Sequence, residues 1–290
     1  MSGVVLRRGS PSPGESDLDE WLGAAKALAR RAGRMQLEGH SGADDGCSKF
    51  TIDEKSVVDL VTSVDKACEA LIFETLKEKY AHHKFIGEES AAEVELGDDL
   101  TWCVDPVDGT SNYVHNFPAF CVSIGLFYEK KPILGVIFDP SKDEMYEAVR
   151  GRGAFCNGER LRVDSADTLP KAVVATNFGH TRDEDFVDSQ IRGLRRLCDE
   201  SIRGVRMIGS CCISMALVAK GVLSCYYEAN VGGLWDVAAG AIIIEEAGGV
   251  IANVRTGAPY TFEAGKQHVC CGNEKIVAQV LRVLRDETNE

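Results

Sequence analysis

The sequence predicts a mixed α/β fold, with two helices and an antiparallel sheet in the first half and alternating strands and helices in the second. Three observations support this. Two amphipathic helical patterns precede residue 80, short apolar runs separated by turn residues fill 84–163, and strand and helix patterns alternate after residue 170. At 290 residues the chain is long enough for one large domain or two closely fused ones.

The N-terminal region predicts a flexible arm followed by two helices. Residues 1–15 are rich in Ser, Pro, Gly and Arg without periodicity, which is typical of an unpacked segment. Ser16 and Asp19 resemble a helix cap, and apolar residues then recur at helical spacing, which predicts a helix over about 17–38. After a stretch rich in Gly, Ser and Asp (39–56), a second amphipathic pattern between Val64 and Leu76 predicts another helix.

The rest of the chain predicts strands first and alternating elements later. Strands are expected at 84–89, 100–106, 120–128, 131–140 and 143–149, with a hairpin over 151–163. Beyond these, strands are expected at 172–176, 223–228, 249–254 and 268–272, and helices at 183–198, 210–220, 236–247 and 274–286. We therefore divide the chain into a helix pair with an antiparallel sheet (16–165) and a smaller α/β half that completes a cleft (166–290).

Composition excludes several classes of function. The formal net charge of −13 disfavours a nucleic-acid-binding protein, which depends on a basic surface. No run approaches the roughly 18 apolar residues of a membrane span, and the N-terminus lacks the apolar core of a secretory signal. We therefore expect a cytoplasmic protein with no membrane partner.

The cysteines favour reduced thiols. Their number, eleven, is odd, and the pairs Cys211–Cys212 and Cys270–Cys271 are adjacent within apolar stretches, so a disulfide framework is not expected. Because no C-x-x-C pair is followed by a matching Cys or His pair, the sequence does not predict a structural zinc site.

The most specific chemical signal runs from Asp105 to Thr110, at the end of a predicted strand. Two carboxylates three residues apart, with a Pro that restricts φ and a Gly that permits a sharp turn, are suited to converge on one point. Oxygen ligands of this kind select hard cations, Mg²⁺ first and Mn²⁺ as a substitute. The residues from Thr110 onward are expected to open a short helix whose N–H groups face a phosphate. A tight turn without chemistry is the alternative for this segment alone.

Two further acidic residues are candidates for the same site. Glu88 follows a short strand, and a solvated turn is its alternative role. Asp236 precedes a strongly apolar helix, and a helix N-cap is its alternative role.

Together these segments resemble the inositol monophosphatase family, within the lithium-sensitive, metal-dependent phosphatase superfamily. Five ordered blocks carry the resemblance from about residue 57 to 273: V-D-L-V-T-x-x-D (58–65), F-I-G-E-E-S (85–90), W-x-x-D-P-V-D-G-T-x-N (102–112), G-A-F-C-N-G (153–158) and W-D-V-A-x-G (235–240). The resemblance implies a layered αβαβα fold like that of inositol monophosphatase and fructose-1,6-bisphosphatase, with metals in the cleft.

The resemblance also implies ligands for two or three Mg²⁺ ions. Glu88, Asp105 and the Val107 carbonyl match the first metal site, and Asp105, Asp108 and Asp236 match the second. A third, water-rich site would depend on Glu88, which also counts among the expected catalytic residues.

The remaining implied roles concern water and substrate. Asp65 and Thr110 match the pair that orients an attacking water. The expected substrate-binding positions, some of them also metal ligands, are Asp108, Gly109, Thr110, Ser111, Gly209, Ser210, Cys211, Glu228 and Asp236. Glu228 would accept hydrogen bonds from inositol hydroxyls.

The function implied is Mg²⁺-dependent hydrolysis of inositol monophosphates by a metal-activated water, by a lithium-sensitive homodimer. Alternatives are a related phosphatase acting on 3′-phosphoadenosine 5′-phosphate, fructose bisphosphate or histidinol phosphate, or a catalytically silent scaffold. The segment from Glu228 to Asp236 is one residue longer than in typical animal members, so substrate choice is the more open part of this interpretation.

Overall fold

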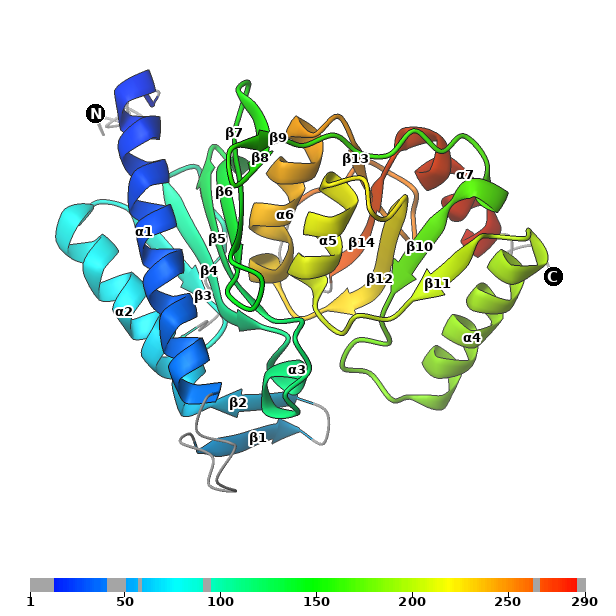
Figure 1. Ribbon diagram of the computed structural model, residues 1–290, viewed down its shortest axis with the longest axis horizontal. Helices are drawn as coiled ribbons and strands as arrows, with labels where there is room; N and C mark the ends of the chain where they lie inside the picture. Colours follow the sequence, from blue (N-terminus) through cyan, green and yellow to red (C-terminus); the bar gives the residue numbers. More distant parts are fainter. Residues whose placement is uncertain (1–12, 41–50, 57–58, 91–94, 263–266, 286–290) are drawn as a thin grey trace, which may run out of the picture.

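The computed structural model describes residues 13–40, 51–56, 59–90, 95–262 and 267–285. Its elements form five layers, helix, sheet, helix, sheet and helix, as Figure 1 shows from left to right. The layered αβαβα fold expected from the family resemblance is therefore confirmed. Of the predicted flexible arm, residues 1–12 lie outside the described residues, and Glu15 already belongs to the first helix.

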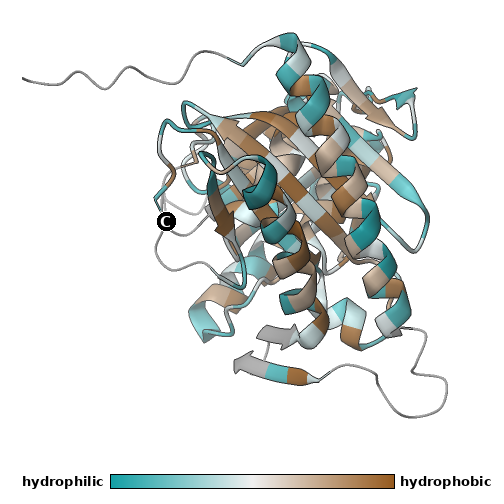
Figure 2. Ribbon diagram, turned by 90° about the vertical axis from the view of Figure 1, so that its left-hand side faces the viewer, coloured by the Kyte–Doolittle hydropathy of each residue, from teal (hydrophilic) through white to brown (hydrophobic). Residues whose placement is uncertain are grey.

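The first layer consists of two long helices, α1 (Glu15–His40) and α2 (Ser63–Lys79), as predicted. Thr62 caps α2, because its hydroxyl accepts the Asp65 amide while the Asp65 carboxylate accepts the Thr62 amide. The helices pack on the larger sheet through buried apolar residues such as Ala25, Leu28 and Ile72. Figure 2 looks onto this layer and shows mostly apolar strands behind the two helices.

The second layer is a seven-stranded sheet whose strand order follows the chain. Its strands are β3 (Lys84–Gly87), β4 (Thr101–Asp108), β5 (Cys121–Tyr128), β6 (Lys131–Asp139), β7 (Glu144–Val149), β8 (Gly153–Cys156) and β9 (Glu159–Arg160). The sheet is mainly antiparallel, as predicted, and differs only at one edge, where β3 runs parallel to β4. The 13 residues between these strands are long enough to return the chain to the same end of the sheet, as a parallel pairing requires.

The third layer is formed by α5 (Cys211–Ala219) and α6 (Leu234–Glu246), which lie between the two sheets. Ten of the thirteen α6 residues are buried, and a helix that is apolar on all sides is typical of such an interior position. Asp236 lies at the third position of α6, so it is not the N-cap residue.

The outer layers complete the second half. The five-stranded sheet has the order β11-β10-β12-β14-β13, with β10 (Val173–Thr176), β11 (Gly204–Arg206), β12 (Cys225–Val231), β13 (Val250–Asn253) and β14 (Gln267–Gly272). The helices α4 (Glu184–Asp199) and α7 (Glu274–Arg285) cover its outer face. The short elements are α3 (Thr110–Val114), as predicted, and the 3₁₀ helix η2 (Leu169–Lys171). The division of the chain near residue 165 stays a prediction.

Three strands were not predicted: β1 (Ile52–Ser56), β2 (Asp59–Thr62) and β11. The β1 sequence IDEKS is largely polar, and β11 has three residues, so neither carries an apolar pattern long enough to recognise. All ten described cysteines are free thiols. Within the described residues, no helix is both long and apolar enough to cross a membrane.

Candidate active site

Three carboxylates from two elements meet in one cavity. Asp105 and Asp108 end β4, and Asp236 lies in the first turn of α6. One oxygen from each lies within 4.8 Å of the others, and all three side chains are buried. Glu88 joins the same cavity because β3 is parallel to β4, so both strands end at the same edge of the sheet. The Glu88 amide extends this pairing by donating to the Val104 carbonyl at 3.2 Å.

The loop that carries these acids depends on local geometry. The Asp105 carboxylate accepts the Val107 amide at 3.0 Å, and the β4–β5 register shifts between Asp105 and Asp108, which turns both carboxylates toward the cavity wall. Gly109 follows with φ of 91°, and a Cβ there would lie 2.8 Å from the Ala119 carbonyl oxygen. The glycine expected at the turn is thus required both by its backbone conformation and by a close neighbour.

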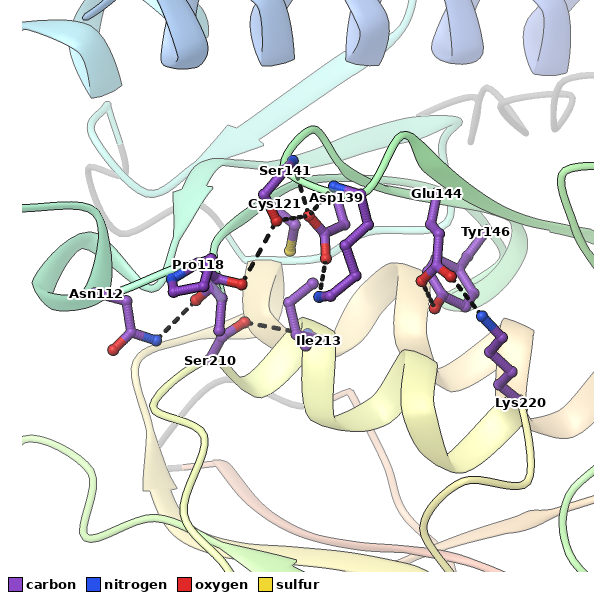
Figure 3. A network of polar contacts seen from close by, with 12 residues as sticks. Asn112, Pro118, Cys121, Asp139, Ser141, Glu144, Tyr146, Ser210, Ile213 and Lys220 are labelled. Carbon is purple, nitrogen blue, oxygen red and sulfur yellow. Dashed lines mark hydrogen bonds and ion pairs between the residues drawn. The ribbon is translucent and has the colours of Figure 1, made fainter. Parts of the chain in front are cut away.

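Asp108 is also bound by the N-terminus of α5. Its carboxylate accepts the Cys212 amide at 2.8 Å, the Cys211 amide at 3.3 Å and the Ser210 hydroxyl. The Ser210 hydroxyl in turn accepts the Ile213 amide at 3.1 Å, so it caps α5 (Figure 3). These donors stabilise a charged carboxylate and connect β4 to the third layer.

The three acids are electrostatically unfavourable without a cation. Burial, then the charge of Glu88, raises the pKa of Asp105 well above its usual range. Burial, then the charge of Asp108, raises the pKa of Asp236 to about 7. A divalent cation would offset both effects, and a set of carboxylate oxygens is the donor set that Mg²⁺ and Mn²⁺ prefer. The residues present therefore fit such an ion.

Asp65 and Thr110, predicted as a pair from distant segments, are in contact. The Thr110 hydroxyl lies 3.2 Å from the Asp65 carboxylate and 3.0 Å from the Val107 carbonyl oxygen. Asp65 is fully buried, and burial raises its pKa to about 6, although its hydrogen bonds from Thr62 act in the opposite direction. Thr110 lines the cavity whereas Asp65 lies behind it. A carboxylate in this position can hold the threonine hydroxyl in a fixed orientation.

Residues of the second half also line this cavity. Glu228 on β12 lines the cavity, which has a volume of about 470 Å³. Its carboxylate accepts the Asn177 side-chain amide at 2.9 Å and the Tyr226 hydroxyl, while burial raises its pKa to about 7. The Asn177 side-chain oxygen accepts the Gly209 amide at 2.9 Å. Asn177 therefore fixes two of the predicted substrate-binding positions relative to each other.

The structure brings nearly all predicted positions to this cavity. Those that line it are Glu88, Asp105, Val107, Asp108, Gly109, Thr110, Ser111, Gly209, Cys211, Glu228 and Asp236. Ser210 does not line it, because its hydroxyl is buried against Asp108. The functional roles of all these residues stay predictions.

Two asparagines to which the sequence analysis assigned no role position the site. Asn112 donates to the Ala119 carbonyl at 2.7 Å and to the Ile208 carbonyl at 2.8 Å, so it connects the loop after α3 to the segment before α5. The sequence feature that could have revealed Asn112 is its position at the end of the family block 102–112. Asn177 lies in the segment T-N-F-G-H-T (176–181), which carries no pattern specific enough to reveal its partners.

Comparisons with known proteins agree with this geometry. The sequence profile described as "Inositol monophosphatase family" matches residues 17–288. The chain is 47% identical over 238 residues to inositol monophosphatase 2 of Solanum lycopersicum, covering 81% of this chain and 87% of that protein. It is 38% identical over 278 residues to inositol monophosphatase 1 of Homo sapiens, covering 92% and 97%.

Solved structures share the fold. The extragenic suppressor protein suhB of Bartonella henselae superposes with a TM-score of 0.82 and 31% identity, over 91% of this chain and 98% of that one. The inositol monophosphate-bound structure of SaIMPase-II superposes with a TM-score of 0.76 and 26% identity, over 92% and 94%.

Proposed function

The chain belongs to the inositol monophosphatase family, and from this premise we propose that it hydrolyses inositol monophosphates to inositol and phosphate with Mg²⁺ as cofactor. As a member of this family it is an enzyme, a hydrolase of phosphate monoesters. The observation that carries the proposal is the cavity of about 470 Å³ that is lined both by three buried carboxylates and by Glu228. One wall suits a cation with a phosphate, and the other suits a polyol.

The first group of residues is proposed to bind the cations. Two or three cations would be held by Glu88, Asp105, Asp108, Asp236 and the Val107 carbonyl, with Mn²⁺ as a possible substitute for Mg²⁺. When bound, the cations supply electrophilic activation of the attacking water and neutralise charge on the phosphate and the leaving oxygen. The Val107 carbonyl oxygen lies 3.0 Å from the Thr110 hydroxyl oxygen and has two lone pairs, so it could bind a cation while Thr110 keeps its position.

Asp65 and Thr110 orient the attacking water. The Asp65 carboxylate accepts a hydrogen bond from the Thr110 hydroxyl, which leaves the threonine oxygen free to accept a hydrogen bond from the attacking water. Gly109 and Ser111, beside it at the start of α3, offer backbone N–H groups and a hydroxyl to the phosphate.

Glu228 selects the alcohol. A carboxylate held by Asn177 and Tyr226 keeps acceptor positions free for substrate hydroxyls, since each carboxylate oxygen accepts more than one hydrogen bond. A polyol with neighbouring hydroxyls fits this arrangement, and the Gly209 amide, which donates to the Asn177 side chain, fixes the backbone beside it.

The test is phosphate release from myo-inositol 1-phosphate, fructose 1,6-bisphosphate and 3′-phosphoadenosine 5′-phosphate, each with Mg²⁺ and with excess chelator. We expect chelator-sensitive turnover that is fastest with the inositol ester. Faster turnover of another ester would overturn the substrate assignment and leave the cation site intact. Turnover of none of the three would favour a silent scaffold.

Three finer properties are proposed on less direct grounds. A homodimer and inhibition by lithium follow from family membership alone. The cytoplasm is the proposed location because the chain has many free thiols, which persist in a reducing compartment.

A further inference from the structure

Two cysteine thiols lie directly behind Asp108. Cys121 begins β5 and Cys212 lies in the first turn of α5, so the two thiols come from the second and third layers. A carboxylate oxygen of Asp108 and the two sulfur atoms all lie within 4.8 Å of one another, and all three side chains are buried. This cluster shares Asp108 with the cation site described above, but its other two ligand atoms are sulfur.

The spacing of the cluster matches tetrahedral metal coordination. The Cys121 sulfur lies 3.6 Å from the Asp108 carboxylate. In a tetrahedral zinc site with a zinc–sulfur distance of about 2.3 Å and a zinc–oxygen distance of about 2.1 Å, sulfur and oxygen are about 3.6 Å apart. The Cys212 sulfur lies 3.1 Å from the Asp236 backbone carbonyl, which is a further oxygen next to the cluster.

We propose that Asp108, Cys121 and Cys212 form a second, inhibitory metal site that takes a thiophilic divalent cation such as Zn²⁺ or Cd²⁺. Sulfur ligands favour soft cations over Mg²⁺, so the cluster and the carboxylate site select different ions. Asp108 lines the cavity, and the two buried thiols lie directly behind it. On binding, each thiol releases its proton to solvent and coordinates as thiolate.

Inhibition follows from the shared ligand. An Asp108 carboxylate that coordinates a cation together with Cys121 and Cys212 donates less charge to a cation held by Asp105 and Asp236. A thiophilic cation at this site therefore competes with Mg²⁺ for Asp108.

Another thiol pair provides a matched control. Cys225 on β12 and Cys270 on β14 have sulfur atoms 3.7 Å apart and are equally buried. Within the described residues, no group of metal-ligating side chains includes this pair. The comparison separates the effect of two neighbouring thiols from the effect of two thiols with a carboxylate.

The first experiment measures the ultraviolet cadmium–thiolate charge-transfer band during anaerobic titration with Cd²⁺. The exposed Cys198, and Cys47, which lies outside the described residues, are replaced by serine in every protein compared, to remove other thiol sites. We expect a band that saturates at one equivalent, is lost in Cys121→Ala and in Cys212→Ala, and is kept in Cys225→Ala. Serine variants at positions 121 and 212, checked by circular dichroism, separate loss of the ligand from loss of the fold.

A second experiment measures inhibition by Zn²⁺ at fixed Mg²⁺, with each variant referred to its own rate without Zn²⁺. We expect Cys121→Ala and Cys121→Ser to raise the inhibitory concentration at least tenfold and Cys225→Ala to leave it unchanged. A cadmium band that persists at full amplitude in Cys121→Ala and Cys212→Ala, or no band in the parent protein, would overturn the site. Because the band is read without substrate, it tests the site independently of the proposed reaction.

Discussion

The two walls of the cavity carry acids in opposite environments. The cation wall, formed by Asp105, Asp108 and Asp236, places carboxylates beside carboxylates from β4 and α6. The alcohol wall, formed by Asn177, Gly209 and Glu228, surrounds one carboxylate with protein donors from β10, β12 and their loops. Burial raises carboxyl pKa values on both walls, and repulsion from several carboxylates adds to this on the cation wall. On the other wall, Asp108 alone adds repulsion to Glu228, and the bonds from Tyr226 and Asn177 lower the Glu228 pKa. The protein therefore completes the alcohol wall by itself, whereas the cation wall needs a bound ion.

The largest effect is expected from Asp108→Asn, which removes a charge from the cation wall and keeps its shape. The amide oxygen can still accept the Cys212 amide, so the fold should persist. We expect the rate with saturating substrate to fall by on the order of a thousandfold, because charge stabilisation in the transition state is lost. Initial rates and circular dichroism measure the two effects.

The matched control for this change is Glu228→Gln on the alcohol wall, which also replaces a buried carboxylate by an amide. It should act mainly on KM, because substrate binding rather than cation binding is altered. If both variants lowered kcat equally, the division into two walls would be wrong.

The next effect is a pH dependence of stability confined to the metal-free protein. Asp236 holds its proton in the folded state up to a pKa of about 7, compared with an ordinary value of 3.8. Between these values the folded state binds more protons than the unfolded state, so the free energy of unfolding falls as pH rises. As pH rises from about 4 to above 7, we expect the free energy of unfolding of the metal-free protein to fall by on the order of a few kcal/mol relative to that of Asp236→Asn.

The measurement is chemical denaturation of both proteins in chelator across this range, repeated with saturating Mg²⁺. Carboxyl groups remote from the cavity are common to both proteins and cancel in the difference, which therefore reports Asp236 together with the acids that it repels. A difference that does not change with pH would show that Asp236 titrates normally in the folded chain. Saturating Mg²⁺ should reverse the trend, because the ion binds the charged form.

A smaller effect is expected from Asn177→Ala, which leaves Glu228 without one donor and the Gly209 amide without its acceptor. A hydrogen bond to a charged group contributes about 1.5–3 kcal/mol, so kcat/KM should fall about tenfold or more. The Mg²⁺ concentration for half-maximal rate should stay within twofold of the parent value. A large shift in that concentration instead would place Asn177 with the cation wall.

The smallest effect is expected from Glu69→Ala on α2. The buried Glu69 carboxylate accepts the Glu89 amide at 2.9 Å and so holds the turn that carries Glu88. Its loss should raise the Mg²⁺ concentration for half-maximal rate severalfold, because a positioning contact of this kind contributes about 1 kcal/mol. Glu69→Gln keeps an acceptor oxygen and should restore most of the Mg²⁺ affinity, and failure to do so would exclude this role.

The sequence by itself determined the helices, most strands and the position of each acidic segment. These features depend on local patterns, such as the apolar period of α1 and the turn residues around Asp105 and Gly109. The family blocks added the pairing of Asp65 with Thr110, which no local pattern contains. The same reasoning overlooked β1, β2 and β11, whose strand pairing stabilises segments without a recognisable apolar pattern.

Only the tertiary structure decided which side chains from different layers are in contact. Asn177 reaches Glu228 from 51 residues away, and Cys212 lies against Asp108 from 104 residues away. The parallel pairing of β3 with β4 places Glu88 beside Asp105 at one edge of the sheet. Such contacts depend on how whole helices and strands pack together in the core. A short stretch of sequence does not contain this information.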